Sequence, residues 1–308
     1  MAMRLLRWFT RPLRSVAKRA GYVVVTQQEL TDLRDTVAAL QHAVSAPGAT
    51  VDYQVLTDYV AKQRKFEHTD PEFFALYERV KPYTMTSIER LYAMHKAVGH
   101  VARSGVQGAI VECGVWRGGS MMMAALTLAA LGKTDRELFL FDTFAGHPRP
   151  NPERDLKEHY EFWLQRRRTD RSSSWAEVTL EEVRANLSST GYPLDRVRFV
   201  KGIVQETIPA AAPDTIALLR LDTDWYDSTA HEMRYLYPRL VPSGVLIVDD
   251  YGEMPGQRQA VDEFFRENGI TLLLNRIDPS GRIAVKSVDR QSQVPPLVVA
   301  ETEVGGCG

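Results

Sequence analysis

The sequence is poor in cysteine, has almost no net charge and lacks any long apolar run. Only two of its 308 residues are cysteines, Cys113 and Cys307, which excludes a disulfide framework and indicates a reducing compartment. No stretch approaches the roughly 18 apolar residues that span a bilayer. The net charge of -1 argues against a nucleic-acid partner. We therefore expect a cytoplasmic protein with one large core or two modest ones.

The first 50 residues differ in character from the rest. Residues 1–25 are rich in arginine and lysine, and the first acidic residue is Glu29. Their Trp and Phe fall on one face of a predicted amphipathic helix, which could lie on the inner face of an anionic membrane or pack on its own domain. Apolar residues between Leu30 and Val44 then follow a heptad-like spacing, which predicts a helix that packs on the domain or supports self-association.

From Gly108 onward, short apolar runs alternate with helical patterns. Such alternation predicts an α/β fold with parallel strands. Before this region we expect a helix over 71–79 and another that begins with a capping box of Thr86 and Glu89. The expected strands cover 109–113, 138–141, 197–201, 216–221 and 245–248, and a closing hairpin pairs 272–274 with 283–286.

Three aspartates follow two of these strands. Asp222 comes directly after 216–221, and Asp249 and Asp250 come directly after 245–248. Because a helical crossover makes the two strands parallel, both acidic ends should emerge at the edge where open α/β sheets bind ligands. Three carboxylates suit a hard cation, with magnesium as the first choice. The alternative is that these acids cap helices or face solvent.

A glycine-rich turn, 114–120, follows the first strand and opens a helix. It lets a ligand approach the backbone closely, but its spacing departs from the dinucleotide fingerprint G-x-G-x-x-G. Glu112 would repel a pyrophosphate there, whereas Asp142 after the second strand is placed to hold a ribose diol. Gly202 leaves space beside the expected adenine. Together these features favour S-adenosylmethionine over NAD, although either acid alone could simply cap a helix.

The alternation breaks between about residues 145 and 178. An insertion above the ligand edge of the sheet is a candidate lid. It contains three consecutive arginines, 166–168, which could meet an anionic group or be solvated. It also contains two candidate general bases, His159 and Asp170.

Six separated stretches, all in the expected order, closely resemble the macrocin O-methyltransferase family. That family includes bacterial methyltransferases that act on sugar hydroxyls of macrolide and aminocoumarin antibiotics. The likeness covers about residues 80–286. The stretches are KPYTMTS, VECGVWRGGS, FDTFAGHP, LRLDTDWYDST, LYPRL and LIVDDYGEMPGQRQAVDEFF.

The resemblance implies a Rossmann-like class I methyltransferase, with a mostly parallel seven-stranded sheet, helices on both faces and an N-terminal helical extension. It implies S-adenosylmethionine as donor, Mg²⁺ at Asp222, Asp249 and Asp250, a sugar-containing acceptor and a homo-oligomer. Tyr83 to Thr86 would lie over the cofactor. The implied donor-binding residues are Glu112, Gly114, Val115, Trp116, Gly118, Gly119, Ser120, Asp142, Thr143, Phe144, Gly202 and Asp222.

The same resemblance sets the expected domains. We expect an extension over 1–50, a helical segment covering the cofactor site over 51–86, the methyltransferase domain over 87–288, and a loose tail over 289–308.

The family resemblance leaves two candidates for the catalytic base. Some family members have a lid histidine as the proposed base, and Asp170 stands at that place in this sequence. In other members the second acid of the D-x-D pair is proposed, which is Asp224 here, and we favour it, with Asp222 beside it as metal ligand. Two other functions stay open: methylation of a catechol-like phenol with the same metal chemistry, and non-catalytic binding of an adenosyl ligand. The acceptor itself could be an antibiotic sugar, a polysaccharide or a glycolipid.

Overall fold

The computed structural model describes residues 6–7, 24–25 and 70–287, and the chain divides into two compact units, 1–74 and 75–308. In the first unit, β1 (Leu6–Arg7) and β2 (Val24–Val25) pair as short parallel strands. Leu6 and Arg7 lie within the segment for which an amphipathic helix was predicted, and they are extended here. The rest of that segment, the predicted helix over 30–44 and the predicted tail over 289–308 lie outside the described residues.

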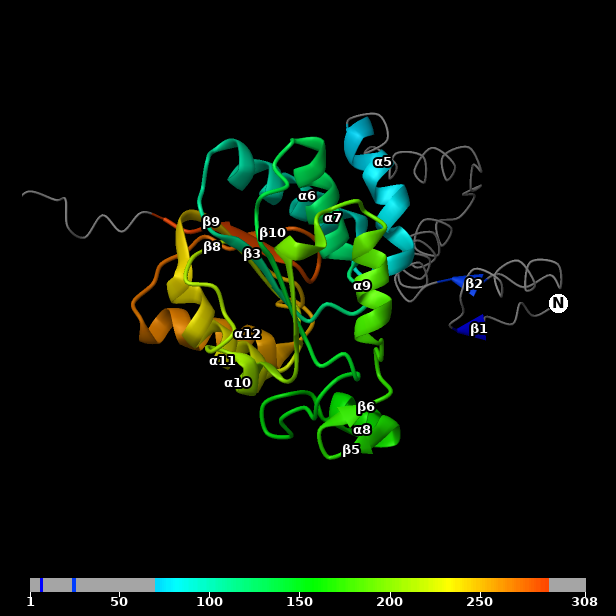
Figure 1. Cartoon of the computed structure of the whole chain (residues 1–308). Coiled ribbons are helices and arrows are strands. Elements are labelled where there is room, and N and C mark those ends of the chain that lie inside the picture. The colour runs from blue at the N-terminus through cyan, green and yellow to red at the C-terminus, as the bar shows by residue number, and fades with distance from the viewer. Residues whose placement is uncertain (1–5, 8–23, 26–69, 288–308) are drawn as a thin grey trace, which may run out of the picture. The chain divides into compact units, whose positions relative to one another are not determined.

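The second unit contains a seven-stranded sheet in the order β10-β11-β9-β8-β3-β4-β7 (Figure 1). Five strands, β9, β8, β3, β4 and β7, are parallel to one another. At the other edge, β11 pairs with β9 and β10 pairs with β11, both in antiparallel orientation. The predicted mostly parallel sheet is confirmed. The strands are β3 (Ala109–Cys113), β4 (Leu138–Asp142), β7 (Val197–Lys201), β8 (Ile216–Leu221), β9 (Leu240–Val248), β10 (Asn275–Arg276) and β11 (Arg282–Val285).

The closing hairpin is shorter than predicted. Residues 272–274 lie outside any strand, and β10 begins only at Asn275. Leu273 is 76% exposed, so an apolar run here did not mark a buried strand. The turn over 278–281 is present as expected, because the Asp278 carboxylate accepts the backbone N–H groups of Ser280 and Gly281.

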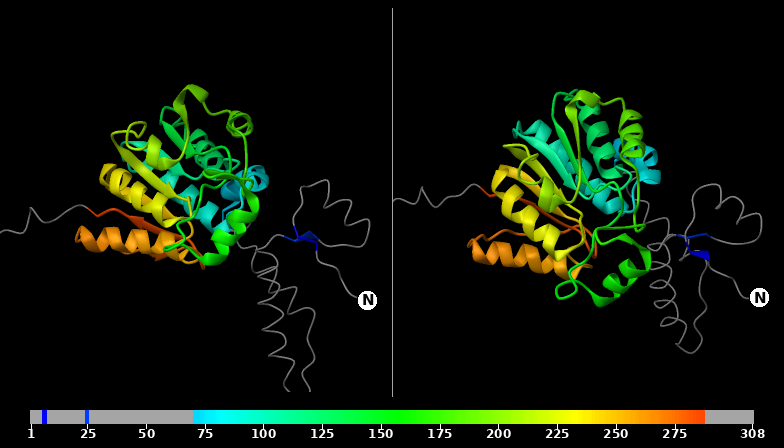
Figure 2. Two further views of the ribbon diagram at one scale, coloured as in Figure 1. Left: turned by 90° about the horizontal axis from the view of Figure 1, so that it is seen from below. Right: turned by 60° about the horizontal axis from the view of Figure 1, so that its bottom comes forward.

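Helices cover both faces of the sheet, as Figures 1 and 2 show. One layer contains α6, α7 and α9, and the other contains α10, α11 and α12. Short 3₁₀ turns η1 (Lys81–Tyr83), η2 (Leu194–Arg196) and η3 (Tyr237–Arg239) connect elements. The helices are α5 (Pro71–Val80), α6 (Ile88–Arg103), α7 (Gly119–Ala130), α9 (Leu180–Ser188), α10 (Val204–Thr207), α11 (Tyr226–Leu236) and α12 (Pro255–Glu267).

The core follows from the alternation of side chains along the strands. Val111 and Cys113 of β3, with Leu219 and Leu221 of β8, point to the face covered by α11 and α12. Their intervening neighbours, such as Ile110, are equally buried on the other face, which explains why these strands read as continuous apolar runs. Each large side chain buried in this way contributes about 1.5–3 kcal/mol.

The N-terminus of α6 begins one residue later than predicted. Ser87, not Thr86, is the N-cap, and its hydroxyl accepts the Arg90 backbone N–H. The predicted capping box of Thr86 and Glu89 is therefore wrong in register. As a consequence, the Thr86 hydroxyl is free of the cap and lies 3.5 Å from both carboxylate oxygens of Asp249.

The insertion after β4 contains α8 (Lys157–Arg166), β5 (Arg167–Thr169) and β6 (Ser172–Ser173). It is attached to the segment after β8: the Trp225 indole donates to the Pro148 carbonyl, and the Tyr226 N–H donates to Asp155 Oδ1 at 2.9 Å. The Trp163 indole also closes the insertion on itself by donating to the His147 carbonyl. The insertion therefore packs at the carboxyl edge of the sheet.

Candidate active site

The glycine turn after β3 is shaped by its contact with the segment after β8. Gly114 has φ +82°, and a Cβ there would overlap the Asp222 carbonyl oxygen. Only glycine satisfies both the conformation and the close approach. The Asp222 N–H in turn donates to the Cys113 carbonyl at 2.8 Å. The ends of β3 and β8 are thereby held together, which fixes the position of Asp222.

Asp142 at the end of β4 is engaged by backbone groups of the turn. Its Oδ2 accepts the N–H groups of Val115 (2.7 Å) and Trp116 (3.1 Å), and its Oδ1 accepts the Phe144 N–H (2.8 Å). Thr143 lies beside it, with its hydroxyl donating to the Gly146 carbonyl. Burial raises the pKa of Asp142 despite these bonds. Asp142 therefore organises the glycine turn. Its predicted contact with a ribose stays a prediction.

The remaining predicted donor-binding residues surround the same turn. A Cβ on Gly119 would meet Tyr83 O and Thr84 Cβ at 2.6 Å, so Tyr83 and Thr84 lie against the turn. The prediction that Tyr83 to Thr86 cover the cofactor stays a prediction. Gly118 has φ +87° and packs against Leu187, whereas Ser120 is buried in the first turn of α7.

Glu112 is buried in β3 and forms an ion pair with Arg220 of β8. Within the described residues its Oε2 has no hydrogen-bond partner. Burial outweighs the charge of Arg220 and raises the pKa of Glu112 to about 7. A buried, partnerless carboxylate oxygen beside the glycine turn is a ready acceptor for a ligand's donor groups.

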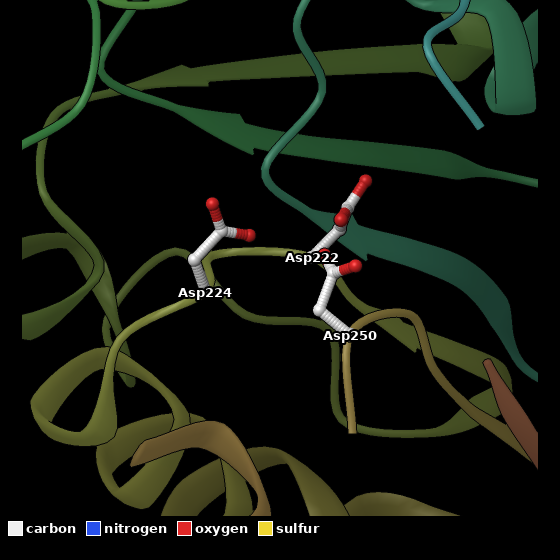
Figure 3. Close-up of side chains that lie close together, drawn as sticks. All are labelled: Asp222, Asp224 and Asp250. Carbon is white, nitrogen blue, oxygen red and sulfur yellow. The ribbon is translucent and has the colours of Figure 1, made fainter. Parts of the chain in front are cut away.

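Three aspartates converge beyond the ends of β8 and β9 (Figure 3). One carboxylate oxygen each from Asp222, Asp224 and Asp250 lies within 4.8 Å of the others. The backbone of Asp250 is held by Gln257 of α12, whose Oε1 accepts its N–H at 2.8 Å. The structure thus brings together two members of the predicted metal set and adds Asp224 to them.

Asp249, the third member of that predicted set, faces two arginines. Its Oδ1 accepts Arg220 Nη2 at 2.6 Å, and its Oδ2 accepts Arg90 Nη1 at 2.6 Å. Arg220 also donates to Asp222 at 2.7 Å. Arg220 therefore connects Glu112, next to the glycine turn, with Asp222 and Asp249 beyond the ends of β8 and β9.

The charges at this edge do not balance within the described residues. Burial and mutual repulsion raise the pKa values of Asp222, Asp224 and Asp250. Burial acts in the same sense on Asp249, but its pairing with Arg220 and Arg90 lowers its pKa. Arg90 and Arg220 pair with five acidic side chains here, which are Glu112, Asp222, Asp249, Asp250 and Asp278. Asp224 lies next to His147.

Three predicted site residues have unusual backbone conformations. Trp116, Phe144 and Asp224 have φ values of 45°, 48° and 67°, in the left-handed region that non-glycine residues rarely adopt. They follow β3, β4 and β8, respectively. Such strain persists where surrounding contacts enforce it, and its concentration here supports a functional role for this edge. Gly202 also has a positive φ, 144°, and it donates its N–H to the Asp142 carbonyl.

Aromatic rings from the insertion after β4 and from Trp225 lie next to Asp224. His147 Nε2 lies 3.6 Å from Asp224 Oδ2, and the His147 ring contacts Trp175 and Trp225. Burial lowers the pKa of His147 to about 4, so it is neutral near pH 7 and the contact is not an ion pair. His159, a candidate base in the sequence, contacts the same two indoles.

Asp170, the other predicted lid base, lies elsewhere. Its side chain is 86% exposed in the β5–β6 turn and pairs with Arg167 at 3.3 Å. It is not among the three gathered aspartates. The structure therefore places Asp224, and not Asp170, at the acidic cluster.

Sequence reasoning did not identify Arg220, Arg90 or His147 as site residues. Arg220 had a visible signal, because a charged residue interrupts the apolar run of β8 just before Asp222. Arg90 reads as an ordinary solvated helix residue, and His147 lies in an irregular stretch. Their positions depend on long-range packing that local patterns do not encode.

The sheet order, the glycine turn after the first parallel strand and the acids at the carboxyl edge together define a class I methyltransferase. The family model described as Macrocin-O-methyltransferase (TylF) matches residues 25–284. The chain therefore belongs to the macrocin O-methyltransferase family and is an S-adenosylmethionine-dependent O-methyltransferase.

Characterised relatives agree with this assignment. Mycinamicin III 3''-O-methyltransferase of Micromonospora griseorubida is 34% identical over 200 residues, covering 65% of this chain and 76% of the relative. A tetracenomycin-C rhamnosyl 4'-O-methyltransferase of Streptomyces olivaceus is 35% identical over 199 residues, covering 65% and 74%. The structure of the O-methyltransferase NovP matches with a TM-score of 0.61 and 35% identity, covering 67% of this chain and 83% of that chain.

No helix among residues 70–287 and the other described positions is long and apolar enough to cross a bilayer. The predicted contact of residues 1–25 with a membrane surface stays a prediction.

Proposed function

We propose that this enzyme methylates a hydroxyl of a sugar in a glycosylated natural product, polysaccharide or glycolipid, with a divalent cation, Mg²⁺ first, at the acidic cluster. The observation that carries the proposal is the convergence of Asp222, Asp224 and Asp250 next to the glycine turn. The relatives' names support the sugar acceptor: mycinamicin, tetracenomycin rhamnosyl and novobiocin derivatives.

The atoms available to bind a metal at the acidic cluster fit a hard cation. The gathered ligands are all carboxylate oxygens, which Mg²⁺ prefers over nitrogen or sulfur. The excess of carboxylates over arginines also fits a site for cations, both the divalent ion and the positively charged sulfonium donor. Asp222 and Asp250 belong both to the set predicted from the sequence and to the gathered group, so we assign them as metal ligands. Asp249 is the third predicted ligand.

A bound divalent cation would supply Lewis-acid stabilisation of an acceptor oxygen as it loses its proton. The chain's own residues do the remaining work. Asp224, the member of the cluster that is not among the predicted metal ligands, would accept the hydroxyl proton, and burial with its acidic neighbours raises its pKa. Asp142 and Glu112 would hold the donor through its ribose and amino groups. His147, Trp175 and Trp225 would exclude water from the acceptor side.

The test is Asp250→Ala with a panel of acceptors and labelled donor. We expect transfer to rhamnosides, none to catechols, loss of transfer on chelation, and a loss of at least ~100-fold in the variant. Asp227→Ala, a more exposed aspartate on α11 that pairs with Asn151, is the matched control. Near wild-type transfer by Asp250→Ala with metal chelated would overturn the metal mechanism, and preference for catechols would overturn the acceptor class.

The predicted homo-oligomer is a further part of this proposal. The family resemblance supports it, and light scattering coupled to gel filtration on the full chain would measure it. A strictly monomeric enzyme with full activity would contradict it.

A further inference from the structure

Arg90 links three separate segments at the acidic cluster. From the first turn of α6, its Nη1 donates to Asp249 Oδ2 at 2.6 Å and to Asp250 Oδ1 at 3.2 Å. Its Nε donates to Asp278 Oδ2 at 2.7 Å, in the turn between β10 and β11. The side chain is only 11% exposed, so these are partly desolvated, charge-assisted bonds.

The position of Arg90 is built by the fold. The Ser87 hydroxyl accepts the Arg90 N–H and donates to Asp278 Oδ2 at 2.7 Å, which fixes the start of α6 on the β10–β11 turn. A Cβ on Gly281 would come within 3.2 Å of Arg90 Cδ, so the aliphatic stem also packs on this turn. The stem and Nε are therefore anchored at Asp278, and the end of the guanidinium reaches the cluster.

The end of that guanidinium stands between two consecutive aspartates that both belong to the predicted metal set. A positive charge that contacts oxygens of Asp249 and Asp250 together is what a cation shared by them would provide. Asp249, which is not in the gathered group, has one oxygen paired with Arg90 and the other with Arg220.

We propose that Arg90 is an internal substitute for the divalent cation. It neutralises Asp249 and Asp250 while the metal is absent, and it yields Asp249 to the ion when the metal binds. This inference rests on the proposed metal site. It makes Arg90 a positioning residue, because it acts through the aspartates and not on the reacting atoms.

Asp278 would remain an ionic partner of Arg90 after the guanidinium moves away from Asp249 and Asp250. It already accepts both Nε and the Ser87 hydroxyl, so Nη1 can leave the aspartates while Arg90 keeps an ionic partner. Without that partner, Arg90 would compete more strongly for the cluster. The two residues should therefore affect metal affinity in opposite directions.

The experiment is calorimetric titration of the full chain with MgCl₂, without donor or acceptor. Removing the competing charge in Arg90→Met should tighten Mg²⁺ binding by about tenfold, as expected for the loss of one partly buried ion pair to the ligands. Asp278→Asn should weaken it by roughly threefold or more, because Arg90 loses its alternative partner. The asparagine Oδ1 can still accept the Ser280 and Gly281 N–H groups, so the turn should be kept.

The double variant decides whether Asp278 acts through Arg90. If it does, Arg90→Met with Asp278→Asn should bind Mg²⁺ as tightly as Arg90→Met alone. Arg258→Met is the matched control, because it removes one positive charge nearby. Among residues 70–287, that arginine donates to the Tyr251 carbonyl alone and contacts the Tyr251 ring. Its Mg²⁺ affinity should stay within about threefold of wild type.

Thermal unfolding gives a second readout. Arg90→Met should unfold at a lower temperature than wild type in EDTA and gain more from added MgCl₂, because the ion replaces the missing charge. If Arg90→Met does not fold, Arg90→Lys keeps the charge but cannot bridge Asp278 and both aspartates, and it should bind Mg²⁺ more tightly than wild type. Equal or weaker Mg²⁺ binding by the Arg90 variants, with binding intact in wild type, would overturn this inference alone. Absence of Mg²⁺ binding in wild type would overturn the metal proposal with it.

Discussion

The two halves of the carboxyl edge use acidic residues in different ways. At β3 and β4, the Asp142 carboxylate is engaged by backbone N–H groups of the glycine turn and of Phe144. At β8 and β9, the aspartates face one another, and the arginines beside them are too few to neutralise them. The first half is organised by hydrogen bonds to the main chain, and the second by opposing charges.

The two halves therefore suit different tasks, the first to hold a ligand in a fixed turn and the second to bind ions and move protons. Backbone hydrogen bonds fix a turn whatever ligand is present, so the half at β3 and β4, where we propose that the methyl donor binds, is preformed. Carboxylates held close to one another lie at high energy until a cation or a proton arrives, so the second half is suited to binding ions and moving protons. Arg220 contacts Glu112 in one half and Asp222 and Asp249 in the other, and thus couples the two.

The sharpest test of the difference is Asp224→Asn. Asparagine tolerates the left-handed backbone that Asp224 adopts, so the fold should be kept while the proton acceptor is lost. We expect kcat to fall by about 10²–10⁴ with donor affinity changed less than about threefold. Steady-state kinetics and titration with S-adenosylhomocysteine measure the two quantities. A variant that keeps more than a tenth of kcat would show that Asp224 is not the base.

The counterpart in the donor half is Asp142→Asn. The amide group cannot accept N–H groups on both sides, so part of the clamp on Val115, Trp116 and Phe144 is lost. Losing charge-assisted bonds of about 1–3 kcal/mol should weaken donor binding roughly 10- to 100-fold. kcat at saturating donor should change much less. If kcat fell and donor affinity did not, the division between the two halves would be wrong.

The sequence foretold the donor half better than the ionic half. The runs that became β3 and β8 have the predicted bounds, because strands buried on both faces are almost continuously apolar. The bounds of β7, an edge strand, were also predicted correctly. Gly114 and Asp142 lie where a parallel sheet must place them. Asp222 and Asp250 were predicted to meet for the same reason, and they do.

What sequence patterns did not give are contacts between distant segments. The pairing of Arg90 with Asp249 spans 159 residues, and it depends on the exact start of α6, which was predicted one residue too early. The contact of His147 with Asp224 depends on how the insertion after β4 packs on Trp225. Neither contact has a local periodicity or spacing that could have revealed it.

A smaller effect concerns Glu232, which lies beneath the D-x-D segment and accepts the Thr223 hydroxyl. Burial raises its pKa from 4.5 to about 8, so the folded state holds a proton that the unfolded state releases. Its contribution to stability is present below about pH 4.5 and is lost as pH rises through 8. Glu232→Gln should remove this dependence, which is on the order of 1 kcal/mol per pH unit. Urea unfolding between pH 5 and 9 measures it, and parallel curves for variant and wild type would refute it.

The smallest expected effect is that of Asp170→Ala. Family resemblance makes Asp170 an alternative base, but the structure leaves its side chain 86% exposed and pairs it with Arg167 on the outer turn of the lid. An exposed pair of this kind contributes little, and a solvated carboxylate far from the cluster has no proton to accept. kcat, KM and the pH profile should therefore stay within about twofold of wild type. A 100-fold loss in kcat would instead mean that the β5–β6 turn moves onto the acceptor during turnover. The acidic cluster would then be the metal site alone, with its base delivered by the lid.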